Sequence, residues 1–172
     1  MLNMSRMLKG IWIMGLMSAL LALAACDNQR IVELEEGVST EADVRARFGE
    51  PERIWDAPNG GRTFEYNRQP AGFQNYMITI SADGKMNGLR QVLHKENFAK
   101  VQPGTMMEDV RKLLGKPMKV TPFEQLRETH YDWRYKDGVN NADLKIFTVV
   151  FSPDLRVVST RSVRDPVLEP NQ

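Results

Sequence analysis

Residues 36–55 read EGVSTEADVRARFGEPERIW and residues 103–120 read PGTMMEDVRKLLGKPMKV. These stretches decide the fold because they can be laid over each other almost without gaps, with Gly49 and Gly115 matched at a separation of 66 positions. Self-similarity at a fixed spacing indicates an internal duplication. Further matched pairs, at separations of 66 to 71 positions, are Val44 with Val110, Phe48 with Leu114, Pro51 with Pro117, Gly37 with Gly104, Phe64 with Tyr131, Tyr66 with Trp133, Ser81 with Ser152 and Asp83 with Asp154.

Each copy predicts a short capped helix. Thr40 with Asp43, and Thr105 with Glu108, have the spacing of capping boxes, in which a hydroxyl and a carboxylate satisfy free amides at a helix start. Apolar residues recur at helical spacing after each box. The matched glycines are expected to end the helices in the left-handed conformation, and the prolines two positions later block their continuation.

After each helix, apolar residues alternate with polar ones, which is the pattern of half-buried antiparallel strands. Asp83-Gly84 predicts a hairpin turn, and Ser152-Pro153-Asp154 predicts its counterpart in the second copy. Final strands are expected near Leu89 to Leu93 and near Arg156 to Arg161. The alternating residues are Phe64 and Tyr66; Tyr76, Ile78 and Ile80; Tyr131, Trp133 and Tyr135; and Phe147, Val149 and Phe151.

The predicted fold class is therefore α+β, built from two tandem repeats at residues 35–95 and 101–163. Each repeat is a short helical segment followed by an antiparallel meander of three to four strands. One such unit is too small to bury its sheet face well alone, so we expect the two units to pack together. We expect helices to cover one face of each sheet and to leave the other face open. Residues 164–172, with two prolines and little to bury, predict a flexible tail.

The beginning of the chain predicts a secretory signal peptide over residues 1–25. A basic stretch, an apolar run and small residues stand in the order that such signals require. The apolar run falls short of the roughly 20 residues of a membrane-spanning helix, which makes an uncleaved anchor the second choice. Leu23-Ala24-Ala25-Cys26 looks like a lipobox, the motif that directs acylation of the cysteine and cleavage before it. Residues 26–34 would then be a lipidated linker.

The alternative is that Cys26 is an ordinary cysteine in a hydrophobic segment. It is the only cysteine of the chain, and a lone thiol in a secreted protein invites oxidation or intermolecular pairing. Lipidation leaves no free thiol, and two or more acyl chains anchor a protein stably. We therefore predict attachment to a membrane through acyl chains on Cys26.

Charge excludes one class of partner. Removing residues 1–25, which hold two of the 23 Lys and Arg, from 172 residues leaves 147 residues with 21 Lys and Arg and 22 Asp and Glu. This near-neutral balance gives no basic excess for nucleic acid, so no nucleic-acid partner is predicted. Without disulfides, the stability of the protein must come from a packed core.

Taken together, the motifs resemble the SmpA/OmlA (BamE-like) family of bacterial lipoproteins. The resemblance covers nearly all of residues 33–162 and implies two tandem copies of a domain that familiar members carry once. The tandem arrangement is in turn similar to that of inhibitor proteins of β-lactamases. The residues that carry the match are Gly37, Thr40, Val44, Phe48, Gly49, Pro51, Phe64, Tyr66, Arg68, Gln69, Pro70, Asp83 and Gly84, then Gly104, Thr105, Val110, Leu114, Gly115, Pro117, Tyr131, Trp133 and Asp154.

The resemblance implies a protein-binding accessory or scaffold in cell-envelope biogenesis, acting on outer-membrane proteins, with a protein partner in the envelope. The alternative, from the inhibitor proteins, is a regulatory binder of a periplasmic enzyme. The family's Asp-Pro-Phe segment, associated with partner contact, is matched only in part, by Asp56-Ala57-Pro58 and by Thr121-Pro122-Phe123.

The chain offers little for catalysis. His94 and His130 are expected at strand ends, and neither has a metal-ligand spacing or a neighbouring nucleophile. We therefore predict a protein that is not an enzyme and has no catalytic residue, metal or cofactor. Trp133 is expected in the core, whereas Trp55 is as compatible with a recognition surface as with a core.

The expected location is the cell envelope, with the protein facing the periplasm, and either membrane remains possible. Asp27 follows the predicted lipidated cysteine and looks like a signal for retention in the inner membrane. The family resemblance instead implies the outer membrane.

Overall fold

The computed structural model describes residues 31, 33–138 and 143–166 and divides into two units, residues 1–35 and 36–172. In the first unit, the Leu34 N–H donates to the Ile31 carbonyl at 3.2 Å. The signal peptide, Cys26 and Asp27 lie outside the described residues, so lipidation stays a prediction. No helix in the described part is both long and apolar enough to cross a membrane.

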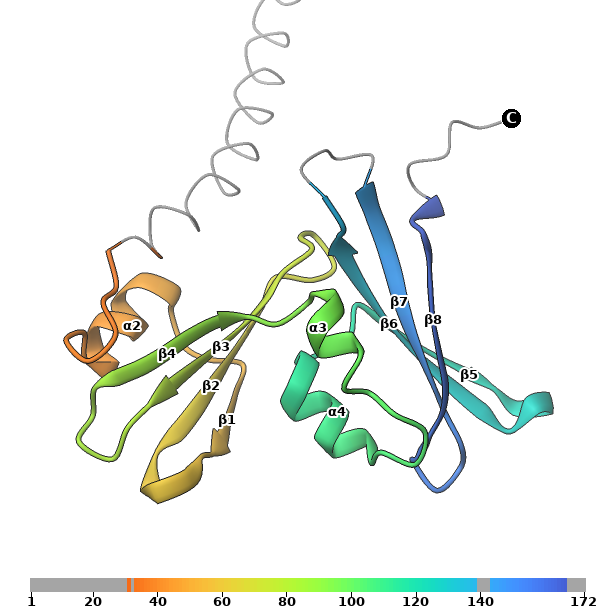
Figure 1. Ribbon diagram of the computed structural model, residues 1–172, viewed down its shortest axis with the longest axis horizontal. Coiled ribbons are helices and arrows are strands. Elements are labelled where there is room, and N and C mark those ends of the chain that lie inside the picture. The colour runs from red at the N-terminus through yellow and green to blue at the C-terminus, as the bar shows by residue number, and fades with distance from the viewer. Residues whose placement is uncertain (1–30, 32, 139–142, 167–172) are drawn as a thin grey trace, which may run out of the picture. The chain divides into compact units, whose positions relative to one another are not determined.

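The second unit holds two four-stranded antiparallel sheets, ordered β1-β2-β3-β4 and β5-β6-β7-β8 (Figure 1). The elements of the first half are α2 (Glu41–Phe48), β1 (Arg53–Asp56), η1 (Pro58–Gly60), β2 (Arg62–Asn67), β3 (Asn75–Ile80) and β4 (Met86–Gln91). Those of the second are α3 (Lys95–Phe98), α4 (Met107–Leu114), β5 (Lys119–Phe123), η2 (Glu124–Leu126), β6 (Glu128–Lys136), β7 (Leu144–Phe151) and β8 (Val157–Arg164). The predicted α+β class is confirmed.

The predicted repeat fits in part. Both halves run helix and then four strands, and the third pair of strands in each sheet has a register shift at equivalent places, Thr79/Ile80 and Val150/Phe151. A difference is the length of the second strand, since β6 has nine residues where β2 has six. β1 and β5 were not predicted, because their side chains are mostly exposed and apolar residues do not alternate with polar ones along them.

Only the first predicted capping box is present. The Thr40 hydroxyl accepts from the Asp43 N–H at 3.3 Å, and the Asp43 carboxylate accepts from the Thr40 N–H at 2.8 Å. The prediction for Thr105 was wrong, because Met106 occupies the N-cap of α4 without a side-chain hydrogen bond. The Thr105 carbonyl accepts the N–H of Val157 at 2.9 Å, as the Ser39 carbonyl accepts that of Met86 at 2.8 Å. The position equivalent to Thr40 is therefore Met106, which has no hydroxyl to act as a cap.

The two matched glycines do end the helices, but not in the left-handed helical conformation that we expected. Gly49 has φ 82° and ψ −162°, and Gly115 has φ 74° and ψ −168°. This extended, positive-φ region is open essentially only to glycine. Each glycine carbonyl then accepts a hydrogen bond from an aromatic side chain of the following sheet, Tyr66 Oη in the first half and Trp133 Nε1 in the second, both at 3.0 Å.

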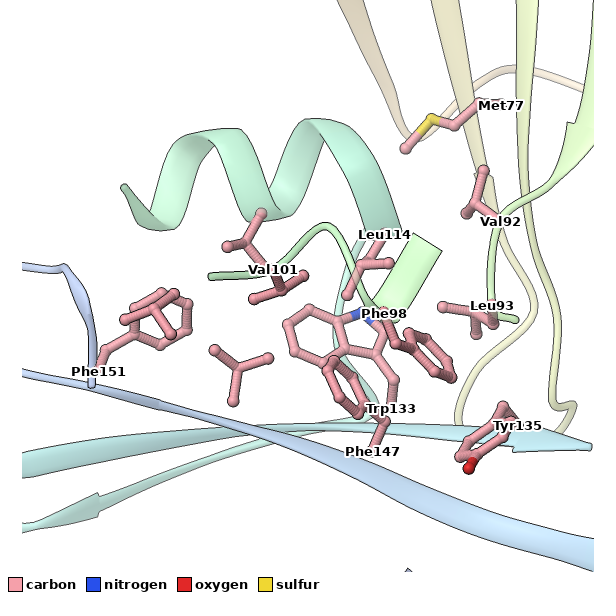
Figure 2. Packing of buried hydrophobic residues seen from close by; sticks show 13 residues of the cluster. Met77, Val92, Leu93, Phe98, Val101, Leu114, Trp133, Tyr135, Phe147 and Phe151 are labelled. Carbon is pink, nitrogen blue, oxygen red and sulfur yellow. The ribbon is translucent and has the colours of Figure 1, made fainter. Parts of the chain in front are cut away.

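Trp133 lies fully buried at the centre of the main core, as predicted. Figure 2 shows its indole between Leu114 of α4 and Phe98 of α3. The Phe98 ring stacks on Phe147 with centroids 4.1 Å apart, so the linker between the repeats contributes to the core. The cluster also takes in Met77 and Val92, so the main core extends into the first half.

The first sheet departs from the expectation of one open face. Glu65 and Asn75 point away from α2 and are fully buried where the first sheet meets the end of α4. Asn75 Nδ2 donates to the carbonyls of Leu114 and Lys116 at 2.8 and 3.0 Å. The second half therefore covers part of the face that was expected to be open.

The contact between the first sheet and the end of α4, called the junction below, centres on the Glu65 carboxylate. It accepts the backbone N–H of Lys116 at 2.7 Å, Trp55 Nε1 at 3.1 Å and the Arg111 guanidinium at 3.2 Å. A second contact is reciprocal, because Gln69 Nε2 donates to the Arg134 carbonyl at 3.1 Å and Gln69 Oε1 accepts the Arg134 N–H at 3.0 Å. These bonds hold the two halves in a defined position relative to each other.

The start of the predicted tail is ordered. Residue 164 ends β8, and Asp165, only 1% exposed, forms an ion pair with Arg134. A buried carboxylate requires such a partner, and this requirement holds the segment to the sheet. Residues 167–172 lie outside the described residues.

Candidate protein-binding surface on the second sheet

The second sheet keeps one face uncovered by helices. Side chains alternate between faces along a strand, so Trp133, Phe147 and Val149 pack toward α4. Their neighbours in the chain point the other way. Cross-strand pairing arranges this outer face in rows, His130 with Val150 and Ser159, Asp132 with Thr148 and Arg161, and Arg134 with Ile146 and Val163.

Exposed apolar side chains gather at one end of this outer face. Phe123 is 40% exposed, Leu126 63% and Val158 47%. Leu126 and Val158 line a shallow depression of about 360 Å³, together with Arg127, Glu128, Ser152 and Pro153. Of these residues, Phe123 and Arg127 are of types enriched in protein-recognition surfaces.

A polar network borders the apolar end. His130 is nearly buried, and the Phe123 ring packs against its imidazole with centroids 4.3 Å apart. Arg161 can only donate, so its contact of 3.4 Å makes His130 Nδ1 the acceptor. Nε2 then carries the proton and donates to Glu128 at 3.1 Å. This chain of contacts fixes the ring that supports Phe123.

A second set of polar groups holds the middle of the face. Thr148 is 2% exposed, and its hydroxyl donates to Asp132 at 2.6 Å. Arg134 is bound on two sides, to Asp165 and to the Pro70 carbonyl at 2.9 Å. These side chains are already engaged, whereas Phe123, Leu126 and Val158 are exposed.

The two histidines lie in different secondary structure elements. His94 is the N-cap of α3 and contacts Glu96 at 2.6 Å, whereas His130 lies within β6 and not at its end. Among the described residues, no group of three His, Cys, Asp or Glu could hold a metal ion. The prediction that the chain is not an enzyme stays a prediction.

Trp55 belongs to the junction and only partly to a surface. Its indole N–H binds the buried Glu65, while the Arg53 guanidinium lies 4.7 Å from the ring centroid.

Leu126 and Val158 were not predicted from the sequence, because a lone apolar residue beside a turn carries no pattern. Phe123 had a signal, the partial match of Thr121-Pro122-Phe123 to the family's partner-contact segment.

Comparison with known proteins yields a family match for the second half. The model of the outer membrane protein assembly factor BamE domain matches residues 91–161. These residues run from the end of β4 through α3, α4 and the second sheet into β8, and they include the candidate surface. No curated protein matches the chain by sequence.

Three solved structures are similar over most of the chain. A DUF4309 family protein from Bacillus subtilis is 23% identical, with 77% of this chain and 83% of that chain covered. A candidate beta-lactamase inhibitor protein from Streptococcus mutans is 9% identical, with 73% and 82% covered. An extracellular protein with an SCP domain from Bacillus anthracis is 16% identical, with 80% and 46% covered. Each TM-score is 0.30, too low to define a common fold.

Proposed function

We propose that this chain is a membrane-anchored periplasmic lipoprotein that binds a protein partner in cell-envelope biogenesis, as an accessory or scaffold for outer-membrane proteins. The observation that carries the proposal is the match of residues 91–161 to the BamE domain model, a range that includes the second sheet up to β8 and the exposed side chains of Phe123, Leu126 and Val158. We further propose that the chain carries two tandem copies of the domain. The shared order of elements and the equivalent register shifts support this.

The binding surface we propose is the apolar end of the outer face. Phe123, Leu126 and Val158 are exposed apolar side chains, and association that removes apolar area from water is favourable. The ordered network beneath Phe123 keeps its ring in place, which lowers the entropy cost of binding. Binding, rather than catalysis, is the role that this arrangement supports.

Crosslinking in intact cells tests the proposal. A photoreactive amino acid replaces Leu126, 63% exposed at the proposed surface, or Val38, 60% exposed outside it, as the matched control. We expect position 126 to yield an envelope protein as a specific crosslinked product and position 38 to yield none. Recovery of the outer-membrane assembly machinery supports the proposal. A single soluble periplasmic enzyme would support the inhibitor-like alternative, and equal crosslinking from both positions would reject the surface.

Attachment through Cys26 and the choice of membrane form a separate part of the proposal. Asp27 favours the inner membrane, and a scaffold of the outer-membrane machinery requires the outer one. The segment from residue 26 to 33 spans at most about 3.5 Å per residue, which is too short to bridge the periplasm. Separation of membranes by density decides the location, with Asp27→Ser as the internal control. Banding of the wild type with the inner membrane would exclude a stable place in the outer-membrane machinery.

A further inference from the structure

The edges of the two sheets differ in how much of their backbone is covered. β1 has only four residues, and β5 contains Pro122, which has no N–H to offer. The first residue of each last strand is bonded to the segment before the helix, Met86 of β4 to Gly37 and Ser39, and Val157 of β8 to Gly104 and Thr105. Further along the β4 edge, the Leu89 N–H donates to Glu36 Oε1 at 3.2 Å. β8 has eight residues and no proline, and among the described residues its backbone is bonded to the segment before α4 at Val157.

The β8 edge presents backbone groups in the pattern that a new strand requires. Asp165, the residue after β8, donates its N–H to the Leu144 carbonyl of the segment that forms β7. Backbone groups alternate in direction along an antiparallel strand. The N–H and C=O groups of Thr160, Ser162 and Arg164 therefore point away from β7. The side chains of residues 158–164 are all exposed, so neither face is blocked by a neighbouring element.

The charge of this edge selects the kind of partner. Residues 158–164 read VSTRSVR, with two arginines, Arg161 and Arg164, and no carboxylate. Asp165 does not offset them, because it is buried and paired with Arg134. Antiparallel pairing with the β8 of a second copy would bring arginines directly opposite or diagonal to one another, and like charges in such positions are destabilising. An acidic strand would instead be attracted.

We propose that the β8 edge, residues 158–164, accepts an extended acidic segment of a protein partner as an added antiparallel strand. Main-chain hydrogen bonds supply affinity in such a complex, and the alternating side chains supply specificity. The inference rests on the proposed function and names the chemistry of the partner. The added strand would continue the outer face, since Val158 lines both the edge and the depression beside Leu126.

The test measures binding of a fluorescent peptide to the full-length chain in detergent by anisotropy. The probe alternates glutamate with threonine and valine, and its control has lysine in place of each glutamate. Ser162→Pro removes an outward N–H without removing a bond to β7, and Ser162→Ala removes only the side-chain hydroxyl. We expect Ser162→Ala to bind the acidic peptide like the wild type. We expect Ser162→Pro to bind about tenfold more weakly, with the lysine peptide weak throughout.

A second pair of substitutions keeps the test decisive if the proline variant fails to fold. Arg161→Glu with Arg164→Glu is expected to reverse the preference from the acidic to the lysine peptide, with melting followed by circular dichroism as the control for folding. Equal binding by both Ser162 variants, or no effect of charge reversal, overturns the inference. So does a dimer of the wild type that Ser162→Pro abolishes, because the occupant is then a second copy. Failure here, together with specific crosslinking from Leu126, would leave the proposed function standing.

Discussion

Truncation of Glu65 to alanine should strongly destabilise the protein by breaking the buried junction between its halves. The carboxylate is fully buried and accepts three hydrogen bonds, from Lys116, Trp55 and Arg111. The Arg111 side chain is 19% exposed, and its Nε has no hydrogen-bond partner within the described structure. Removing Glu65 thus strands a largely buried cation, at a cost of about 3–5 kcal/mol.

The assay is thermal and urea unfolding of the full-length chain in detergent, followed by far-ultraviolet circular dichroism. A chain of this size loses roughly 2–4 °C in melting temperature per kcal/mol, so Glu65→Ala should melt at least about 6 °C lower. The matched control is Glu52→Ala, which breaks an exposed ion pair with Lys116 Nζ and should cost less than about 1 kcal/mol.

Glu65→Gln separates hydrogen bonding from charge. The amide oxygen can still accept from Lys116, but its nitrogen would face the indole N–H of Trp55, donor against donor. We expect a cost of about 1–3 kcal/mol, between those of the control and of the alanine variant. Arg111→Ala and the double variant complete a cycle, whose coupling should be on the order of 0.5–3 kcal/mol. A Glu65→Ala cost within error of that of Glu52→Ala, or no coupling, would refute the reasoning.

Three further predictions follow from local features. Gly115→Ala should destabilise by about 1–3 kcal/mol more than Gly49→Ala, because both have positive φ but only at Gly115 would the new Cβ meet Asn75 Nδ2, at 2.9 Å; equal unfolding midpoints in urea would contradict this. Burial raises the pKa of Tyr66 to about 12. The free energy of unfolding that the protonated Tyr66 contributes is therefore full below pH 10 and is lost as the pH rises toward 12. Tyr66→Phe should lose less stability over that range, and the pH dependence of melting measures it. Metabolic labelling with a fatty-acid analogue should mark the wild type and not Cys26→Ser; an unlabelled wild type would reject lipidation.

The α+β class, the helices α2 and α4 and the main hairpins could be predicted from the sequence. These features depend on short-range chemistry, such as the capping box at Thr40 and the matched Gly-x-Pro helix ends. The match of Tyr66 with Trp133 also had a structural meaning, since each donates to the glycine carbonyl after its helix. Residue type and spacing were sufficient for these predictions because the contacts lie within one repeat.

Only the tertiary structure decided which surfaces are covered. Glu65 and Asn75 lie in strands whose sequence predicts an open polar face, yet both are buried by the second half. Thr105 has the spacing of a cap, but in the structure it is equivalent to Ser39, and Met106 takes the cap position. The exposure of Phe123 and the open edge of β8 likewise depend on which elements pack nearby. Burial and free hydrogen-bonding edges result from contacts between residues far apart in the chain, so local periodicity cannot specify them.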